Sequence, residues 1–166
     1  MLSVIFALLF NKTMMYSILI SSHSVARWLV LISILIAIYT GIKGQLYKLK
    51  FSKKDDLIRH WTATIAHIQL TIGIILYTQS PFVSYFWKNF NKAIYHLDSL
   101  FFGIIHILIM IIAIVIITIG SSIAKRKQTD KEKFKTIWIF YSIALILILM
   151  AIPWPFSPLA TRPYIR

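Results

Sequence analysis

The chain has 166 residues, 58% of them hydrophobic, and its mean hydropathy is +0.77. Soluble domains have about 45–50% apolar residues, so this composition predicts an integral membrane protein. The absence of cysteine excludes disulfides, thiolate-held iron–sulfur clusters, a cysteine nucleophile and a c-type haem attachment. The net charge is +13 with only five acidic residues, which argues against paired-carboxylate hydrolysis and carboxylate-rich metal sites.

The chain begins with a short apolar extension, residues 1–14, that is too short to cross a bilayer. No basic segment precedes its apolar stretch, so it does not fit a signal peptide. We expect this extension to lie outside the bundle, and Met14 or Met15 is a candidate alternative start. Residues 15–156 then form one four-helix transmembrane domain, and residues 157–166 form a tail on the outer side.

Four apolar runs predict four membrane-spanning helices, each long enough to cross a hydrocarbon core of about 30 Å. Their expected ranges are 17–42, 57–78, 93–120 and 136–152. The aromatic connection 80–91 is predicted to lie along the outer interface. The fourth helix is predicted to stop at Pro153, because proline cannot continue the hydrogen-bond ladder. The expected fold is all-α, a polytopic membrane four-helix bundle.

The basic residues concentrate in two connections, 43–59 and 125–135, each with six Lys or Arg, whereas the middle connection has only Lys88 and Lys92. The positive-inside rule makes both clusters cytoplasmic and puts the middle connection and both termini on the outer, periplasmic side. We interpret these charges as anchors on anionic lipid and expect no nucleic-acid partner.

Small or polar residues recur at steps of three and four along the predicted helices, and we expect these stripes to face the bundle centre. The second helix carries His60, Thr64, His67, Thr71 and Thr78. The third helix carries His96, Ser99, Gly103, His106, Met110, Ala113 and Gly120.

Three histidines on three different helices, His23, His67 and His106, have similar predicted depths in the outer half of the membrane. Ionisable side chains at membrane depth are candidates for functional sites. His60 and His96 lie near the predicted membrane boundaries, where they can reach water.

Imidazoles that face each other in a chain without cysteine favour a b-type haem, with two of them as axial ligands. His106 pairs with either His67 or His23 in this hypothesis. Gly103 would leave room for the macrocycle, and Arg27 would pair with a propionate. The spacings of seven and ten residues between histidines on one helix favour one haem over two stacked ones.

Other interpretations of the same residues stay open. His106, His67 and His23 could hold copper or zinc, with Met110 as a further ligand. His67, Gln69 and the threonines could relay protons. The histidines could also be purely structural, each hydrogen-bonded to a neighbouring hydroxyl or carbonyl group.

Several sequence segments in order along the chain resemble a family of small four-helix bacterial membrane proteins labelled cytochrome b-like. They are His23-Ser24 with Arg27-Trp28-Leu29-Val30-Leu31, Ala66-His67-Ile68-Gln69-Leu70 with Gly73 and Leu76-Tyr77, His106 with Ile117-Thr118-Ile119-Gly120, and Phe140-Tyr141 with Ile152-Pro153-Trp154-Pro155-Phe156. The resemblance covers residues 15–156 and implies that His23, His67 and His106 are the family's histidines. The chain departs from it at Ile105-His106-Ile107, where the family often has Glu-His-Pro.

We therefore expect a multi-pass protein of the bacterial inner membrane that carries a single haem b and exchanges electrons between a quinol and a respiratory partner. It is expected to be an electron carrier or accessory subunit more than a stand-alone enzyme. The alternatives are a non-catalytic membrane subunit or assembly factor with structural histidines, and a copper- or zinc-handling protein.

Overall fold

The computed structural model describes residues 12–158 and 160–164. These residues are all-helical, with no strand among them, and four of the helices are long and apolar enough to cross a membrane. The structure confirms the predicted all-α bundle of four candidate spans. The expected extension lies outside the described residues except for residues 12–14, which form the start of the first described helix.

The four long helices are α2 (Lys12–Leu46), α3 (Lys53–Gln79), α7 (His106–Arg126) and α8 (Asp130–Ala151). Between α3 and α7 lie three short helices, α4 (Pro81–Lys88), α5 (Phe90–Ala93) and α6 (Leu97–Leu100), and one π-helical turn, η1 (Phe101–Ile105).

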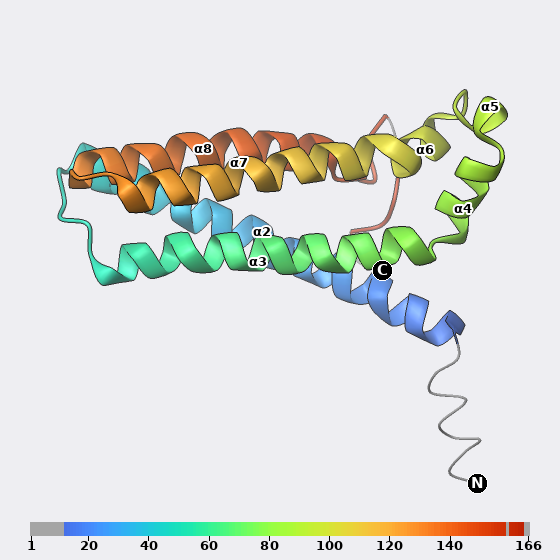
Figure 1. Ribbon diagram of the computed structural model, residues 1–166, viewed down its shortest axis with the longest axis horizontal. Coiled ribbons are helices and arrows are strands. Elements are labelled where there is room, and N and C mark those ends of the chain that lie inside the picture. The colour runs from blue at the N-terminus through green and yellow to red at the C-terminus, as the bar shows by residue number, and fades with distance from the viewer. Residues whose placement is uncertain (1–11, 159, 165–166) are drawn as a thin grey trace, which may run out of the picture.

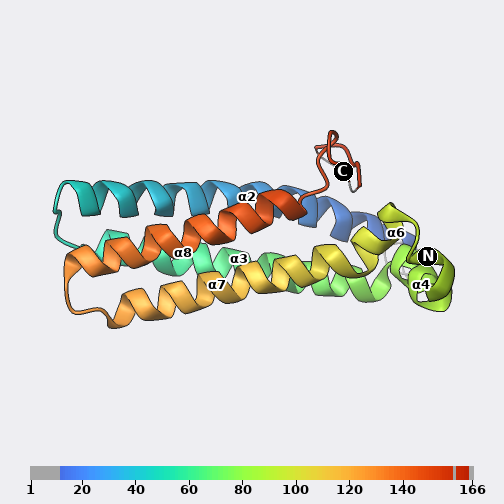
Figure 2. The ribbon, with the colours of Figure 1, turned by 90° about the horizontal axis from the view of Figure 1, so that it is seen from above.

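The long helices run alternately up and down (Figures 1 and 2). α2 packs against α3 and α8, and α7 packs against α8 and α3. The connections α2–α3 and α7–α8 lie together at one end of the bundle, called here the basic end (Figure 1). The two basic clusters lie in these connections and in the helix ends beside them, so most of their residues are helical. Helices α4 to α6 and the tail after α8 lie toward the opposite end, called here the tail end.

Helix caps explain the earlier starts of α3 and α8 and the helical connection between α3 and α7. The third predicted helix, 93–120, is instead divided into α6, η1 and α7, and α7 continues to Arg126. α8 begins six residues earlier than predicted because Thr129 caps it, accepting a hydrogen bond from the backbone N–H of Glu132 at 3.3 Å. α3 begins four residues earlier because Ser52 and Asp55 form a reciprocal capping box. Ser80 caps α4, with Pro81 at its first position, so the connection 80–91 is largely helical.

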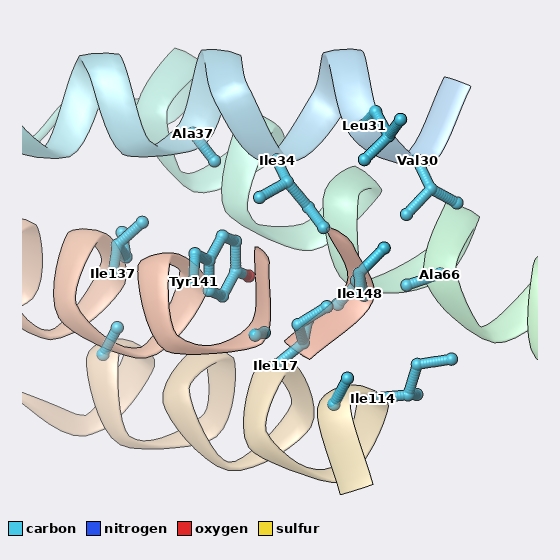
Figure 3. Close-up of a cluster of buried hydrophobic side chains, with 14 of the residues drawn as sticks. Val30, Leu31, Ile34, Ala37, Ala66, Ile114, Ile117, Ile137, Tyr141 and Ile148 are labelled. Atoms are coloured by element: carbon cyan, nitrogen blue, oxygen red, sulfur yellow. The ribbon is translucent and has the colours of Figure 1, made fainter. Parts of the chain in front are cut away.

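One alanine from each long helix packs at the bundle centre. Ala37, Ala66, Ala113 and Ala144 are fully buried in one apolar cluster with Tyr141. Figure 3 shows the Tyr141 ring between Ala37 and Ala66 along the bundle. Alanine allows the backbones to approach closely, which is the main packing device of helices in lipid.

The stripe predicted to face inward on the second helix does not do so. Thr62, Ala63 and Ala66 form the buried face of α3, whereas His67 and Thr71 are exposed. The hydroxyl of Thr71 donates to the carbonyl of His67 at 2.9 Å, so it carries no unsatisfied donor toward lipid. The inward prediction was therefore wrong for this helix, because a threonine can satisfy its hydroxyl within its own helix.

Candidate functional site

A cavity of about 430 Å³ lies between the four long helices and the tail. Its volume is within the roughly 300–1,000 Å³ typical of cofactor and ligand sites. Its polar lining comes from α2 (Tyr16, His23, Ser24 and Arg27), α3 (Gln69 and Tyr77), Ser80, His106 and Arg162 of the tail. Most other lining residues are apolar, which suits a ligand with a large hydrophobic body.

The structure brings two of the three candidate histidines together in this cavity. The ring centroids of His23 and His106 are 6.4 Å apart, and the ring planes are inclined at 67°. Gly73 makes room for His23, because a Cβ at Gly73 would lie 3.2 Å from His23 Cε1. The backbone around His23 is held from α3, since Gln69 Nε2 donates to the His23 carbonyl at 2.9 Å.

The orientation of His106 is set by a backbone carbonyl. His106 Nδ1 lies 2.8 Å from the carbonyl oxygen of Ala151, the last residue of α8. In a continuing α-helix that carbonyl would accept from residue 155, but Pro155 has no N–H. The carbonyl can only accept, so Nδ1 carries the hydrogen and Nε2 bears the lone pair.

This arrangement is the one that metal-binding histidines usually have, with one ring nitrogen donating to an acceptor and the other free to ligate. Ile105, the residue before His106, has no acceptor in its side chain. The Ala151 carbonyl provides an orienting acceptor from another helix.

Three buried polar atoms around the cavity have no hydrogen-bond partner among the described residues. They are His23 Nδ1, Arg27 Nε and Gln69 Oε1, and all three residues line the cavity. Burying polar groups without partners costs free energy. Ordered water or the polar groups of a bound ligand would satisfy these three atoms.

His67 lies outside the cavity lining. Its Nδ1 is 2.7 Å from the Ala63 carbonyl, and its Nε2 is 3.1 Å from the Thr118 hydroxyl on α7. Both ring nitrogens are therefore engaged in bonds between and within helices. His60 and His96 are exposed, at the two ends of the bundle.

Gly103 serves close packing in this structure. A Cβ there would lie 2.5 Å from Phe86 Cδ1, and the Gly103 carbonyl accepts from the Tyr77 hydroxyl at 2.7 Å. Gly103 is not among the cavity-lining residues. The glycine that gives space at the cavity is Gly73.

The π turn η1 ends immediately before His106. Such turns insert one extra residue into a helix and often occur at functional sites. Here the turn carries Phe101 and Phe102, whose rings lie 5.6 and 6.3 Å from the His106 ring. The extra residue changes the facing of every side chain before His106 relative to those after it.

Two contributors to the site were absent from the predicted set. Arg162 lines the cavity from the tail, which hydropathy had marked only as a segment following the last span. The other is the Ala151 carbonyl, which has no intrahelical donor because α8 ends at Ala151 and the backbone is extended at Ile152. The prolines that follow mark this helix end in the sequence.

Comparison with known proteins finds no match: no family model, no curated protein and no solved structure aligns with this chain. Functional assignment therefore depends on the chemistry of the cavity.

Proposed function

We propose that this protein is a membrane electron carrier that holds a single b-type haem, with His23 and His106 as the axial ligands. The carrying observation is the 6.4 Å between the two ring centroids in one cavity. At this separation both imidazoles would reach one haem iron held between them, with bonds of about 2 Å.

Two protein ligands are enough for haem because the macrocycle supplies four more nitrogens. Zinc sites take three or four protein ligands. The described part of the chain has no group of three His, Cys, Asp or Glu side chains that could hold a metal ion. This favours haem over zinc.

The surrounding residues support the same ligand. The apolar lining suits the macrocycle, and Arg27 provides a cation for a propionate. When bound, haem supplies a one-electron redox centre. In the proposed role a membrane quinol and a respiratory-chain protein exchange electrons through it, in a bacterial inner membrane with the connections 43–59 and 125–135 on the cytoplasmic side.

Copper is the second candidate, favoured by a specific placement. Met110 lines the same cavity as His23 and His106, and imidazole with thioether suits Cu(I). In that case the protein handles copper, and Met110→Leu lowers copper content.

The test is a pyridine haemochrome spectrum of the detergent-purified protein made with haem available, with copper and zinc measured on the same sample. We expect about one haem b per wild-type chain. His23→Ala and His106→Ala should each retain at most about one tenth of the wild-type haem content, because each removes one of the two axial ligands.

His67→Ala and His96→Ala are the matched controls, since neither side chain lines the cavity, and both should retain haem close to wild type. Size-exclusion profiles and circular dichroism show that each variant is folded. Folded wild-type protein without haem contradicts the proposal. If that haem-free protein contains copper, the result supports copper handling. If it contains no metal, the result supports a non-catalytic membrane subunit or assembly factor.

A further inference from the structure

The tail after α8 turns back over the cavity and is held there by contacts with α2, α6 and η1. The Trp154 ring lies 6.1 Å from Trp28 of α2, and Tyr164 lies 6.3 Å from Trp154. The carbonyl of Tyr164 accepts a hydrogen bond from Arg27 Nη2. Arg162 and Pro163 line the cavity, so the tail forms part of its wall.

Arg162 is placed by a salt bridge and by a ring. Its Nη2 lies 2.9 Å from Asp98 Oδ2 on α6, and its guanidinium lies 4.5 Å from the centre of the Phe102 ring. The side chain is 22% exposed. Its Nη1 donates to the Thr161 carbonyl at 2.6 Å. The guanidinium is therefore fixed at the cavity edge, and because it has five N–H donors, those not used by Asp98 and Thr161 remain for a ligand.

Arg27 lines the cavity and has no acidic partner among the residues that the structure describes. None of the salt bridges among the described residues includes it. Its Nε is buried without a partner, and Nη2 donates to the neutral Tyr164 carbonyl. A partly buried guanidinium without an anion is unfavourable, so this position suits an acidic group of a ligand.

We propose that Arg27 and Arg162 form a two-arginine clamp for the acidic groups of the cavity's ligand, with the tail as the cover that completes the clamp. The ligand class is a large apolar body with carboxylate or phosphate groups at one edge. This inference depends on the proposed function when the ligand is haem, whose two propionates are such groups. An anionic phospholipid that enters the cavity has the same chemistry.

The test compares three probes on haem-depleted, detergent-purified protein: haem, haem dimethyl ester, and phosphatidylglycerol against phosphatidylcholine. The ester has the same macrocycle and iron without the propionate charges. Haem and ester binding are titrated optically, and lipid binding is measured as the shift in Tm. The variants are Arg27→Gln, Arg162→Gln and the control Arg126→Gln, which is exposed at the basic end.

We expect each clamp variant to bind haem about tenfold more weakly and to bind the ester like wild type, because only the charged contact is removed. Arg126→Gln should match wild type with every probe. Equal weakening of haem and ester in the clamp variants would overturn the clamp, since the arginines would then only hold the tail in place.

The lipid arm separates this inference from the haem hypothesis. If wild type binds neither haem nor ester, the proposed function fails. The clamp is then supported with lipid as the anion source if phosphatidylglycerol raises Tm and both clamp variants abolish that rise. No difference between clamp variants and control with any probe would overturn it.

Discussion

At the residue scale, the histidines differ in what surrounds their ring nitrogens, and this decides which of them can ligate a metal ion. His67 has both nitrogens within hydrogen-bond distance of protein oxygens. His106 is oriented by the Ala151 carbonyl, and His23 has a buried Nδ1 without a partner among the described residues. A ring nitrogen that faces a cavity can ligate a metal ion. His67 lies outside the cavity lining, and its Nε2 contacts Thr118, whose hydroxyl donates to the Ile114 carbonyl.

Glycines show the same dependence on immediate neighbours. Gly103→Ala should lower the free energy of unfolding by about 1–3 kcal/mol, because the new Cβ would lie 2.5 Å from the buried Phe86 ring. Thermal unfolding in detergent measures this. Gly73→Ala is the control, since its Cβ would meet only the His23 ring at 3.2 Å and that ring borders the cavity. Equal stability of the Gly103 variant and wild type would show that the Phe86 ring moves aside without a cost in free energy.

At the scale of elements, the π turn η1 decides how the segment before His106 faces the rest of the bundle. It presents Gly103 to Phe86 and Phe102 to Arg162 while α7 continues with His106 and Met110 toward the cavity. An uninterrupted α-helix would rotate one of these sets by about 100° relative to the other.

Deletion of Ile104 should convert the π turn into an α turn. We expect it to break the Tyr77–Gly103 hydrogen bond, move the Phe102 wall of the cavity and reduce haem retention by about tenfold. The haemochrome spectrum measures this. Tyr77→Phe removes the hydroxyl, with its bonds to the Gly103 carbonyl and Trp87 Nε1, but keeps the ring in the cavity wall and the π turn in place, so it should retain haem. A deletion variant that retains haem like Tyr77→Phe would show that the π turn is unnecessary for the site.

At the scale of the whole molecule, one end of the bundle is stabilised by a buried polar network and carries the charge. Arg59 is buried at the basic end, where it forms a 2.8 Å salt bridge with Asp56 and donates to the Ser121 hydroxyl at 2.6 Å. The Tyr141 hydroxyl donates to the Arg59 carbonyl at 2.9 Å. Arg162 and Pro163 of the tail line the cavity, so the cavity lies toward the tail end, away from the two basic connections.

The sidedness of this polarity can be measured cleanly because the chain has no cysteine. With a membrane-impermeant maleimide on intact cells, Lys88→Cys should be labelled, whereas Lys50→Cys and Lys131→Cys should be labelled only after permeabilisation. The unmodified chain gives the background. Labelling of Lys50→Cys and Lys131→Cys in intact cells would reverse the predicted orientation.

The all-α class, the number of helices long and apolar enough to span a membrane, and the grouping of the basic residues could be predicted from the sequence, because hydrophobic length and charge position are local properties. Caps such as Ser52-x-x-Asp55 and Thr129 were also legible, although the predicted boundaries did not use them. For the site, the sequence predicted only that His23, His67 and His106 lie at similar depths on three different helices. It left open which two of them share a cavity.

Tertiary structure decided which candidates meet. Rotation of a helix about its axis depends on packing, and on α3 the buried alanines turned His67 away from the cavity. Arg162 reached the cavity through its contact with Asp98, 64 positions earlier in the chain, and Gly103 met Phe86 instead of open space. Each outcome depends on contacts between elements far apart in sequence, whose free energies no local pattern contains.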